Sequence, residues 1–238
     1  MARTFTLSEL VSLAKQYADM VGESFVSDAE WRGYISSAYA QLHSVLVSSG
    51  MRYFEGEYEI TTDGGAYYAL PSDLLSVIGV DYLVDGTSTG RREQLREMMV
   101  QERNRFTGVN GSGPATRWYL AGDNLYLAPT PPSSQQYALL YVTQPAKLAT
   151  DGSDDSETID VVTPDGEQFL IWYAVFMARD KEESDVRSAL RERESALERV
   201  REWAALRAFN SPREPMVREE FMENEGDPAD WWWARGGY

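Results

Sequence analysis

Apolar residues recur at intervals of three and four at the start of the chain, which is the period of an amphipathic helix. The first stripe consists of Leu7, Leu10, Val11, Ala14, Tyr17, Ala18 and Val21. The second consists of Trp31, Ile35, Ala38, Tyr39, Leu42 and Leu46. The spacing predicts helices over residues 6–21 and 27–49 that pack as an antiparallel pair along one apolar seam.

Both predicted helices have a start signal in the sequence. Thr6 with Glu9, and Ser27 with Glu30, have the spacing of a capping box. In this motif the hydroxyl accepts a hydrogen bond from a first-turn amide, and the carboxylate accepts one from the backbone of the capping residue. We therefore expect Thr6 and Ser27 to be the N-cap residues.

From residue 51 the pattern changes to period two, which predicts that residues 51–145 form a β-rich region inserted between helical segments. The stretch "YFEGEYEITTDGGAYYALP" indicates two strands around an Asp63-Gly64-Gly65 turn, as in a hairpin. Four further strands are expected in "VIGVDYLVDG", "TRWYL", "NLYLA" and "QYALLYVTQP". Such an inserted meander makes the expected fold class α+β.

Two helical pieces are expected inside the β-rich region. The segment "LPSDLL" predicts a short helical turn. A longer helix is predicted over residues 92–106, with Leu95, Met98, Met99 and Phe106 facing inward.

The last helices are predicted over residues 164–183 and 185–209, where they complete an antiparallel helical bundle with the N-terminal pair. Thr163 is a suitable N-cap, and Pro164 suits the first helical position. The segment "EQFLIWYAVFMA" is apolar almost all round, which is typical of a buried helix. The final helix is amphipathic, with Val186, Leu190, Leu197, Val200 and Ala204 in near-heptad spacing.

Residues 210–238 have no clear periodicity and carry many charges, so we expect an extended segment. Large apolar groups nevertheless occur in it, including three adjacent tryptophans, and such groups anchor short segments in the pockets of a partner. The candidate docking residues are Met216, Phe221, Met222, Trp231, Trp232, Trp233 and Tyr238.

Charge and composition narrow the possible functions. The chain has 38 acidic and 22 basic residues and a formal net charge of −16, so it should repel the phosphates of nucleic acid. The charge fits solubility, and it also fits a surface that lies near DNA without binding it. No cysteine and one histidine exclude disulfides, thiolate metal sites and metal sites with two histidines. We expect His43 to be structural or on the surface.

The sequence contains no phosphate-binding glycine loop and no GxSxG nucleophile motif. A carbohydrate-binding or glycoside hydrolase domain is the enzyme alternative, because 21 tyrosines and tryptophans accompany many carboxylates. Packing explains the same aromatic residues, so we expect no catalytic residue, no cofactor and no metal.

An ordered series of motifs follows the N-terminal helices. Leu70, Pro71 and Asp73 form a Leu-Pro-x-Asp turn before a strand. Downstream come a strand, a turn, a strand, a proline loop and a strand, with Gly113, Pro114, Trp118, Tyr119, Gly122, Leu125, Leu127, Pro129, Pro131 and Tyr141 as the matching residues. Together with the buried helix and the charged helix after it, this order resembles the head-to-tail adaptor (connector) proteins of tailed bacteriophages, over roughly residues 6–209.

The resemblance implies a structural protein of the virion neck, made in the host cytoplasm and without a membrane anchor. Such adaptors form a ring, typically of twelve subunits, beneath the portal protein, and DNA passes through it without sequence-specific binding. A tail or nozzle protein lies on the other side, and C-terminal segments commonly dock on the portal. Residues 1–209 would then be a single adaptor domain and residues 210–238 an extended docking tail. A tail-assembly chaperone, or another virion protein outside the ring, is the alternative.

Overall fold

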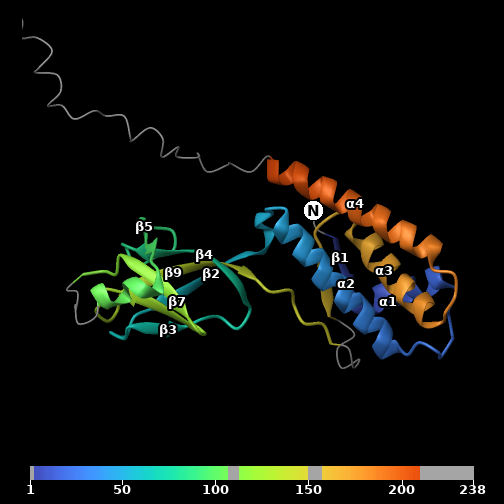
Figure 1. Ribbon diagram of the computed structural model, residues 1–238, viewed down its shortest axis with the longest axis horizontal. Coiled ribbons are helices and arrows are strands. Elements are labelled where there is room, and N and C mark those ends of the chain that lie inside the picture. Colours follow the sequence, from blue (N-terminus) through green and yellow to red (C-terminus); the bar gives the residue numbers. More distant parts are fainter. Residues whose placement is uncertain (1–2, 107–112, 150–156, 210–238) are drawn as a thin grey trace, which may run out of the picture.

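The computed structural model describes residues 3–106, 113–149 and 157–209. The molecule is elongated, with a helical region at one end and a β-region at the other (Figure 1). Helices from the N-terminal part pack with helices from the C-terminal part, and the β-rich segment lies between them in the chain. The predicted α+β class is therefore confirmed.

The helical region contains four helices: α1 (Leu7–Ala18), α2 (Asp28–Ser48), α3 (Gly166–Lys181) and α4 (Arg187–Phe209). Both predicted capping boxes are present. The Oγ1 atom of Thr6 accepts from the Glu9 amide at 3.2 Å, and the Thr6 amide donates to the Glu9 carboxylate at 2.8 Å. Ser27 and Glu30 make the same exchange. The two helix starts are thus set by residues three positions apart.

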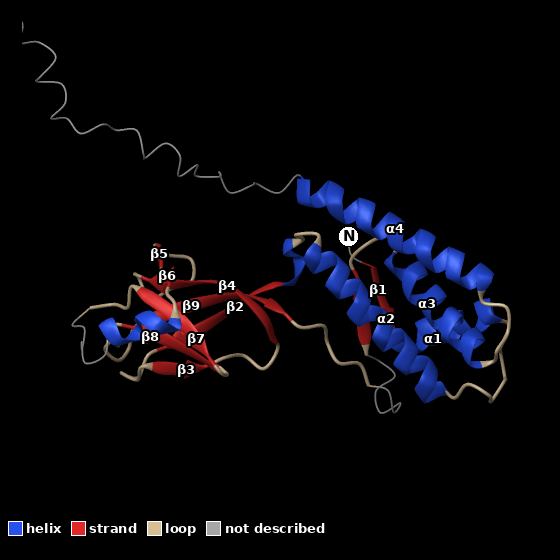
Figure 2. Ribbon diagram, viewed as in Figure 1, coloured by secondary structure: helices blue, strands red, loops and turns tan. Residues whose placement is uncertain are grey.

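A short strand pair joins the helices and was not predicted. Strand β1 (Arg3–Thr6) pairs antiparallel with β10 (Thr158–Val161), beside the helices (Figure 2). The sequence predicts no strand in either segment. The pair connects segments about 150 positions apart, with Arg3 opposite Val161, and such a contact leaves no local signal.

Helix α3 lies at the centre of the helical core. It contacts α1, α2 and α4, and its buried residues include Phe169, Leu170, Ala174 and Val175. Burial on several sides explains why its sequence is apolar almost all round. The face of α4 that reaches the core is made largely of small side chains, namely Ala189, Ala196, Val200 and Ala204. Small residues let α4 approach α3 closely.

Three details of the helical region differ from the predictions. Helix α1 ends at Ala18, so that Val21 lies in the loop that follows and is 71% exposed, and Tyr17 in the last turn of the helix is half exposed. The N-cap of α3 is Asp165 and not Thr163, whose Oγ1 is buried without a hydrogen-bond partner among the described residues. The helix begins at Gly166, where a side chain would not fit because a Cβ would lie 2.6 Å from Val161 Cγ1.

The β-region consists of two four-stranded sheets. One has the order β2 (Glu55–Thr61), β9 (Gln136–Thr143), β4 (Leu74–Leu83) and β5 (Arg92–Gln94). The other has the order β3 (Tyr67–Ala69), β8 (Asn124–Ala128), β7 (Arg117–Ala121) and β6 (Arg96–Glu97). Their inward faces share one core, which includes Val80, Trp118, Leu125, Tyr137 and Leu139.

The strand pairing corrects two predictions. The strands on either side of the Asp63-Gly64-Gly65 turn do not form a hairpin, because β2 pairs with β9 and β3 pairs with β8 in the other sheet. Residues 92–106 do not form one helix. They contain β5, β6 and the 3-10 helix η2 (Val100–Arg105). Leu95 and Met98 face inward as predicted, whereas Met99 is 73% exposed.

Other predictions for the β-region need smaller changes or none. The segment "LPSDLL" forms a turn closed by a hydrogen bond from the Leu74 amide to the Pro71 carbonyl, and then enters β4 directly. Strands β7 and β8 do form the hairpin expected around Gly122, whose positive φ of 60° suits the turn. The inserted β-rich region therefore exists, with its strands divided between two sheets.

The chain crosses between the two regions twice, once before β2 and once after β9. The 3-10 helix η1 (Arg52–Phe54) makes the first crossing. The Phe54 ring packs 4.2 Å from the ring of His43 on α2, and its carbonyl accepts from Thr143 Oγ1 at 3.2 Å. His43 is therefore structural, buried where the two regions meet.

Candidate interaction surfaces

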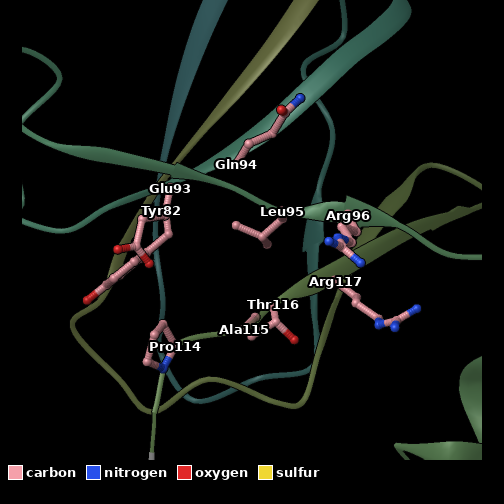
Figure 3. Close-up of a pocket in the computed structure, with 9 residues that line it drawn as sticks. All are labelled: Tyr82, Glu93, Gln94, Leu95, Arg96, Pro114, Ala115, Thr116 and Arg117. Carbon is pink, nitrogen blue, oxygen red and sulfur yellow. The ribbon is translucent and has the colours of Figure 1, made fainter. Parts of the chain in front are cut away.

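A cleft of about 330 Å³ lies between the β5–β6 segment and the start of β7 (Figure 3). Its lining consists of Tyr82, Glu93, Gln94, Leu95, Arg96, Pro114, Ala115, Thr116 and Arg117. Glu93 is the one carboxylate in this lining, and it forms an ion pair with Arg91 at 2.8 Å. A glycosidase needs two carboxylates across its substrate, so the cleft lacks the groups for that reaction.

Other enzymatic features have no counterpart in the described part of the chain. Within residues 3–106, 113–149 and 157–209, no group of three or more histidine, aspartate or glutamate side chains could hold a metal ion. His43 is 2% exposed, so no substrate reaches it. Burial lowers the pKa of its imidazole, although a hydrogen bond to the Thr143 backbone opposes that shift. None of the described helices is long and apolar enough to cross a membrane.

A ladder of three tyrosines covers the outer face of the sheet β3-β8-β7. Tyr67 lies opposite Tyr126, and Tyr126 lies opposite Tyr119. The rings of Tyr119 and Tyr126 stack at 4.7 Å and 14°, and the rings of Tyr67 and Tyr126 lie 5.6 Å apart. Tyr67 is 59% exposed. Aromatic side chains at such positions are common at the centres of protein interfaces.

Arginines border this ladder. Arg103 and Phe106, from the η2 segment, line a hollow of about 250 Å³ together with Tyr119 and Tyr126. Burial raises the pKa of the Tyr119 phenol, and the charge of Arg103 opposes the shift. Arg117 lies over the Phe106 ring at 5.6 Å. We call Tyr67, Tyr119, Tyr126, Arg103 and Arg117 the tyrosine face.

The opposite sheet presents an acidic surface. Glu55, Glu57 and Glu59 occupy alternate, exposed positions of β2, whereas Ile60, next to Glu59, is buried in the core. Alternation therefore directs all three carboxylates away from the core. Arg92 Nη2 donates to both oxygens of the Glu57 carboxylate at 2.9 and 3.0 Å.

Two apolar side chains are exposed on β4 of the same sheet, which β9 separates from β2. The register of β4 against β9 shifts between Leu74 and Ser76 and again between Val77 and Gly79, so Leu75 and Ile78 are the extra residues. Bulges of this kind re-aim side chains and interrupt an edge. Leu75 is 48% exposed and Ile78 is 47% exposed. We call Glu55, Glu57, Glu59, Leu75 and Ile78 the glutamate face.

A third surface lies at the end of the bundle farthest from the β-region. The loop between α1 and α2 exposes Val21 and Phe25, next to half-exposed Tyr17. Tyr17 packs edge-on against Trp172 of α3, with ring centroids 5.4 Å apart. Because α2 has 21 residues and rises about 1.5 Å per residue, this surface is about 30 Å from the junction.

The seven docking residues that the sequence predicts are in a different part of the chain, within residues 210–238. Met216, Phe221, Met222, Trp231, Trp232, Trp233 and Tyr238 all lie outside the described residues. The three surfaces above were not predicted as sites, because periodicity does not distinguish an exposed tyrosine from one in a core. Alternating glutamates in β2 and adjacent tyrosines in β3 were the available sequence signals.

The family of the chain follows from its sequence as a whole. A family model described as SU10 adaptor protein matches residues 5–216. No curated protein sequence matches the chain. The chain belongs to the SU10 adaptor protein family, a family of phage head-to-tail adaptors. It is therefore a structural component of the virion and not an enzyme. The family membership confirms the resemblance to head-to-tail adaptors that the ordered motifs indicated.

Proposed function

We propose that this adaptor forms a twelve-subunit ring beneath the portal protein, in the neck of the virion between capsid and tail. DNA passes through the centre of the ring, and a tail or nozzle protein binds on the side away from the portal. Residues 1–209 act as one adaptor domain, and residues 210–238 act as a tail that docks on the portal.

The observation that carries this proposal is the elongated subunit with two unlike regions (Figure 1). A ring that joins a capsid to a tail needs different surfaces toward the portal, toward the tail and toward its two neighbours. The chain offers an apolar bundle end, a tyrosine face and a glutamate face, on different elements. An enzyme domain would instead concentrate its polar groups in one cleft.

The charge of the chain supports passage of DNA without binding. A formal net charge of −16 gives the subunit a potential that repels phosphates. Proteins that hold DNA statically present lysines and arginines to the backbone. An acidic ring would let DNA slide through during ejection.

Two properties of residues 210–238 support docking of the tail on the portal: their residue types and the length that they can span. Met216, Phe221 and the three tryptophans Trp231, Trp232 and Trp233 are large apolar groups separated by charged residues. Helix α4 ends at Phe209 on the side of the bundle nearer the β-region (Figure 1). The 29 residues from 210 to 238 span up to about 100 Å when extended, which is enough to cross from one ring to the next.

Native mass spectrometry of the adaptor with its purified portal ring tests the proposal. We expect twelve copies of the full-length chain on each portal, and loss of binding for a chain that ends at Phe209. A full-length variant with Trp231→Ala, Trp232→Ala and Trp233→Ala is the matched control, and it should bind less tightly than the parent. Binding that survives truncation would contradict the role of the tail. Absence of the chain from finished virions would favour the assembly chaperone instead.

A further inference from the structure

We propose that the tyrosine face of one subunit packs against the glutamate face of the next subunit, so that the β-regions contribute their own interface to the ring. The inference rests on the ring proposed above and goes beyond it. It assigns two named surfaces of the β-region to contacts between copies of this chain.

The two faces lie on opposite sides of the β-region. The sheets share one core, to which β2 and β9 contribute Ile60 and Leu139 and β7 and β8 contribute Trp118 and Leu125. Outward positions of the two sheets therefore point away from each other. A subunit with two different faces on opposite sides can repeat head to tail, and the repeat closes into a ring when the rotation divides a full turn.

The faces are complementary in charge. The tyrosine face, together with β6 and η2 beside it, carries the arginines Arg96, Arg103, Arg105 and Arg117, against the two glutamates Glu97 and Glu102. This basic excess occurs in a chain with 38 acidic and 22 basic residues. The glutamate face carries three carboxylates on β2, two of which already pair within the subunit: Glu57 with Arg92 at 2.9 Å and Glu55 with Arg52 at 3.6 Å. Glu59 occupies an exposed position on the same face. Opposite potentials across an interface set the partner and the register.

The faces also match in their apolar groups. The glutamate face exposes about half of Leu75 and of Ile78, which the two bulges of β4 turn away from the core. The tyrosine face offers the flat rings of Tyr67, Tyr119 and Tyr126. Apolar contact surrounded by charged pairs is the usual anatomy of a specific interface.

A second copy fits the tyrosine face better than nucleic acid does. Stacked aromatic rings beside arginines also occur in sites for single-stranded nucleic acid. Such sites follow the phosphate backbone with a continuous basic groove, whereas Glu102 interrupts this surface by pairing with Arg105 at 3.5 Å and Arg117 at 3.9 Å. Each subunit carries one face of each kind. A ring of twelve subunits therefore contains twelve tyrosine faces and twelve glutamate faces, so every tyrosine face has a possible partner.

Cysteine cross-linking tests the contact directly, because the natural chain has no cysteine. Thr61→Cys places a thiol at an exposed position at the end of β2, and Asn104→Cys places one at an exposed position of η2. Both changes leave the charged groups of the faces intact. After assembly on the portal, a short bis-maleimide should link the double variant into chains of three and more copies. Each single variant should give no such chains.

The matched control combines Thr61→Cys with Ser24→Cys, an exposed position in the loop between α1 and α2. It carries the same number of thiols and should not form long chains. A fully occupied ring without cross-linked chains from the Thr61–Asn104 pair would overturn the inference and leave the proposed function standing. Failure of the parent chain to occupy the portal would overturn both.

Charge reversal provides a second test. Glu59→Arg or Arg103→Glu alone should raise the concentration needed for half-maximal ring assembly by about tenfold, because each sets like charges against each other. The two changes together in one chain should return it to within about twofold of the parent. Glu23→Arg, which makes the same charge change on the bundle, should have little effect. An equal effect of Glu23→Arg would mean that net charge alone acts, and would overturn the pairing of faces.

Discussion

The helical region and the β-region are built in different ways. The helical region joins the two ends of the described chain, since α1 and α2 pack against α3, more than 100 positions later. The β-region is continuous between Glu55 and Thr143. Each has its own core of buried residues. The β-region is thus an insertion in the helical region, and the chain enters and leaves it through the crossings before β2 and after β9.

The two regions also differ in what they expose. The described residues of the bundle bury most of their apolar side chains, but Val21 and Phe25 are exposed at its far end and Leu206 is exposed on α4. The β-region exposes large side chains on both outer faces, including Tyr67 and Ile78. The proposed contacts between neighbouring copies therefore lie in the inserted β-region.

The largest expected effect tests whether the two cores are independent. Ile35→Ala in the bundle and Leu139→Ala in the β-region each remove a side chain that is fully buried, and each should lower the free energy of unfolding by about 2–5 kcal/mol. Hydrogen exchange should show lost protection in the region that carries the change. Equal loss in both regions for each variant would mean that the protein unfolds as one unit.

A smaller effect is expected from a single hydroxyl in the β-region. Tyr137 is fully buried, and its Oη accepts from the Ala115 amide at 2.8 Å and donates to Gln135 Oε1 at 3.0 Å. Burial raises the pKa of this phenol to about 12, so it stays protonated. Tyr137→Phe leaves the buried amide without a partner and should cost about 1–3 kcal/mol. In urea unfolding, Tyr58→Phe at an exposed position should change stability far less.

The helix caps of the bundle should contribute less again. Ser27→Ala and Thr6→Ala each remove one capping hydrogen bond and should lower the free energy of unfolding by about 0.5–2 kcal/mol. Ser24→Ala, an exposed position just before the second cap, is the control and should be close to neutral. If Ser24→Ala lowered the free energy of unfolding as much as Ser27→Ala does, loss of the capping box would not explain the effect of Ser27→Ala.

The smallest expected effect lies at the junction of the two regions. Burial lowers the pKa of His43 in the folded protein, and the unfolded value is about 6.5. Below about pH 6.5 the unfolded chain therefore binds more protons, so stability should fall as the pH decreases from 7 to 5. Because the chain has one histidine, His43→Leu should flatten this part of the stability profile. An unchanged slope in thermal unfolding would show that carboxylates alone produce it.

Much of the bundle could be predicted from the sequence, and less of the β-region. The caps at Thr6 and Ser27 were correct because a capping box involves residues three positions apart. The hairpin at Asp63 was wrong because its two strands follow each other in the chain yet pair in different sheets. The helix over residues 92–106 was wrong because tertiary pairing with β4 and β7 overrides the local pattern there.

Sequence alone predicts the helix starts, the inserted β-rich region, the acidic charge and the resemblance to adaptors, since each depends on neighbouring residues, composition or motif order. The tertiary structure decided which strands pair, that Met99 is exposed while Met98 is buried, and that tyrosines and glutamates lie on opposite sides of the β-region. These features depend on contacts between distant segments. A strand with period two has two faces, and only its partners decide which face becomes the core.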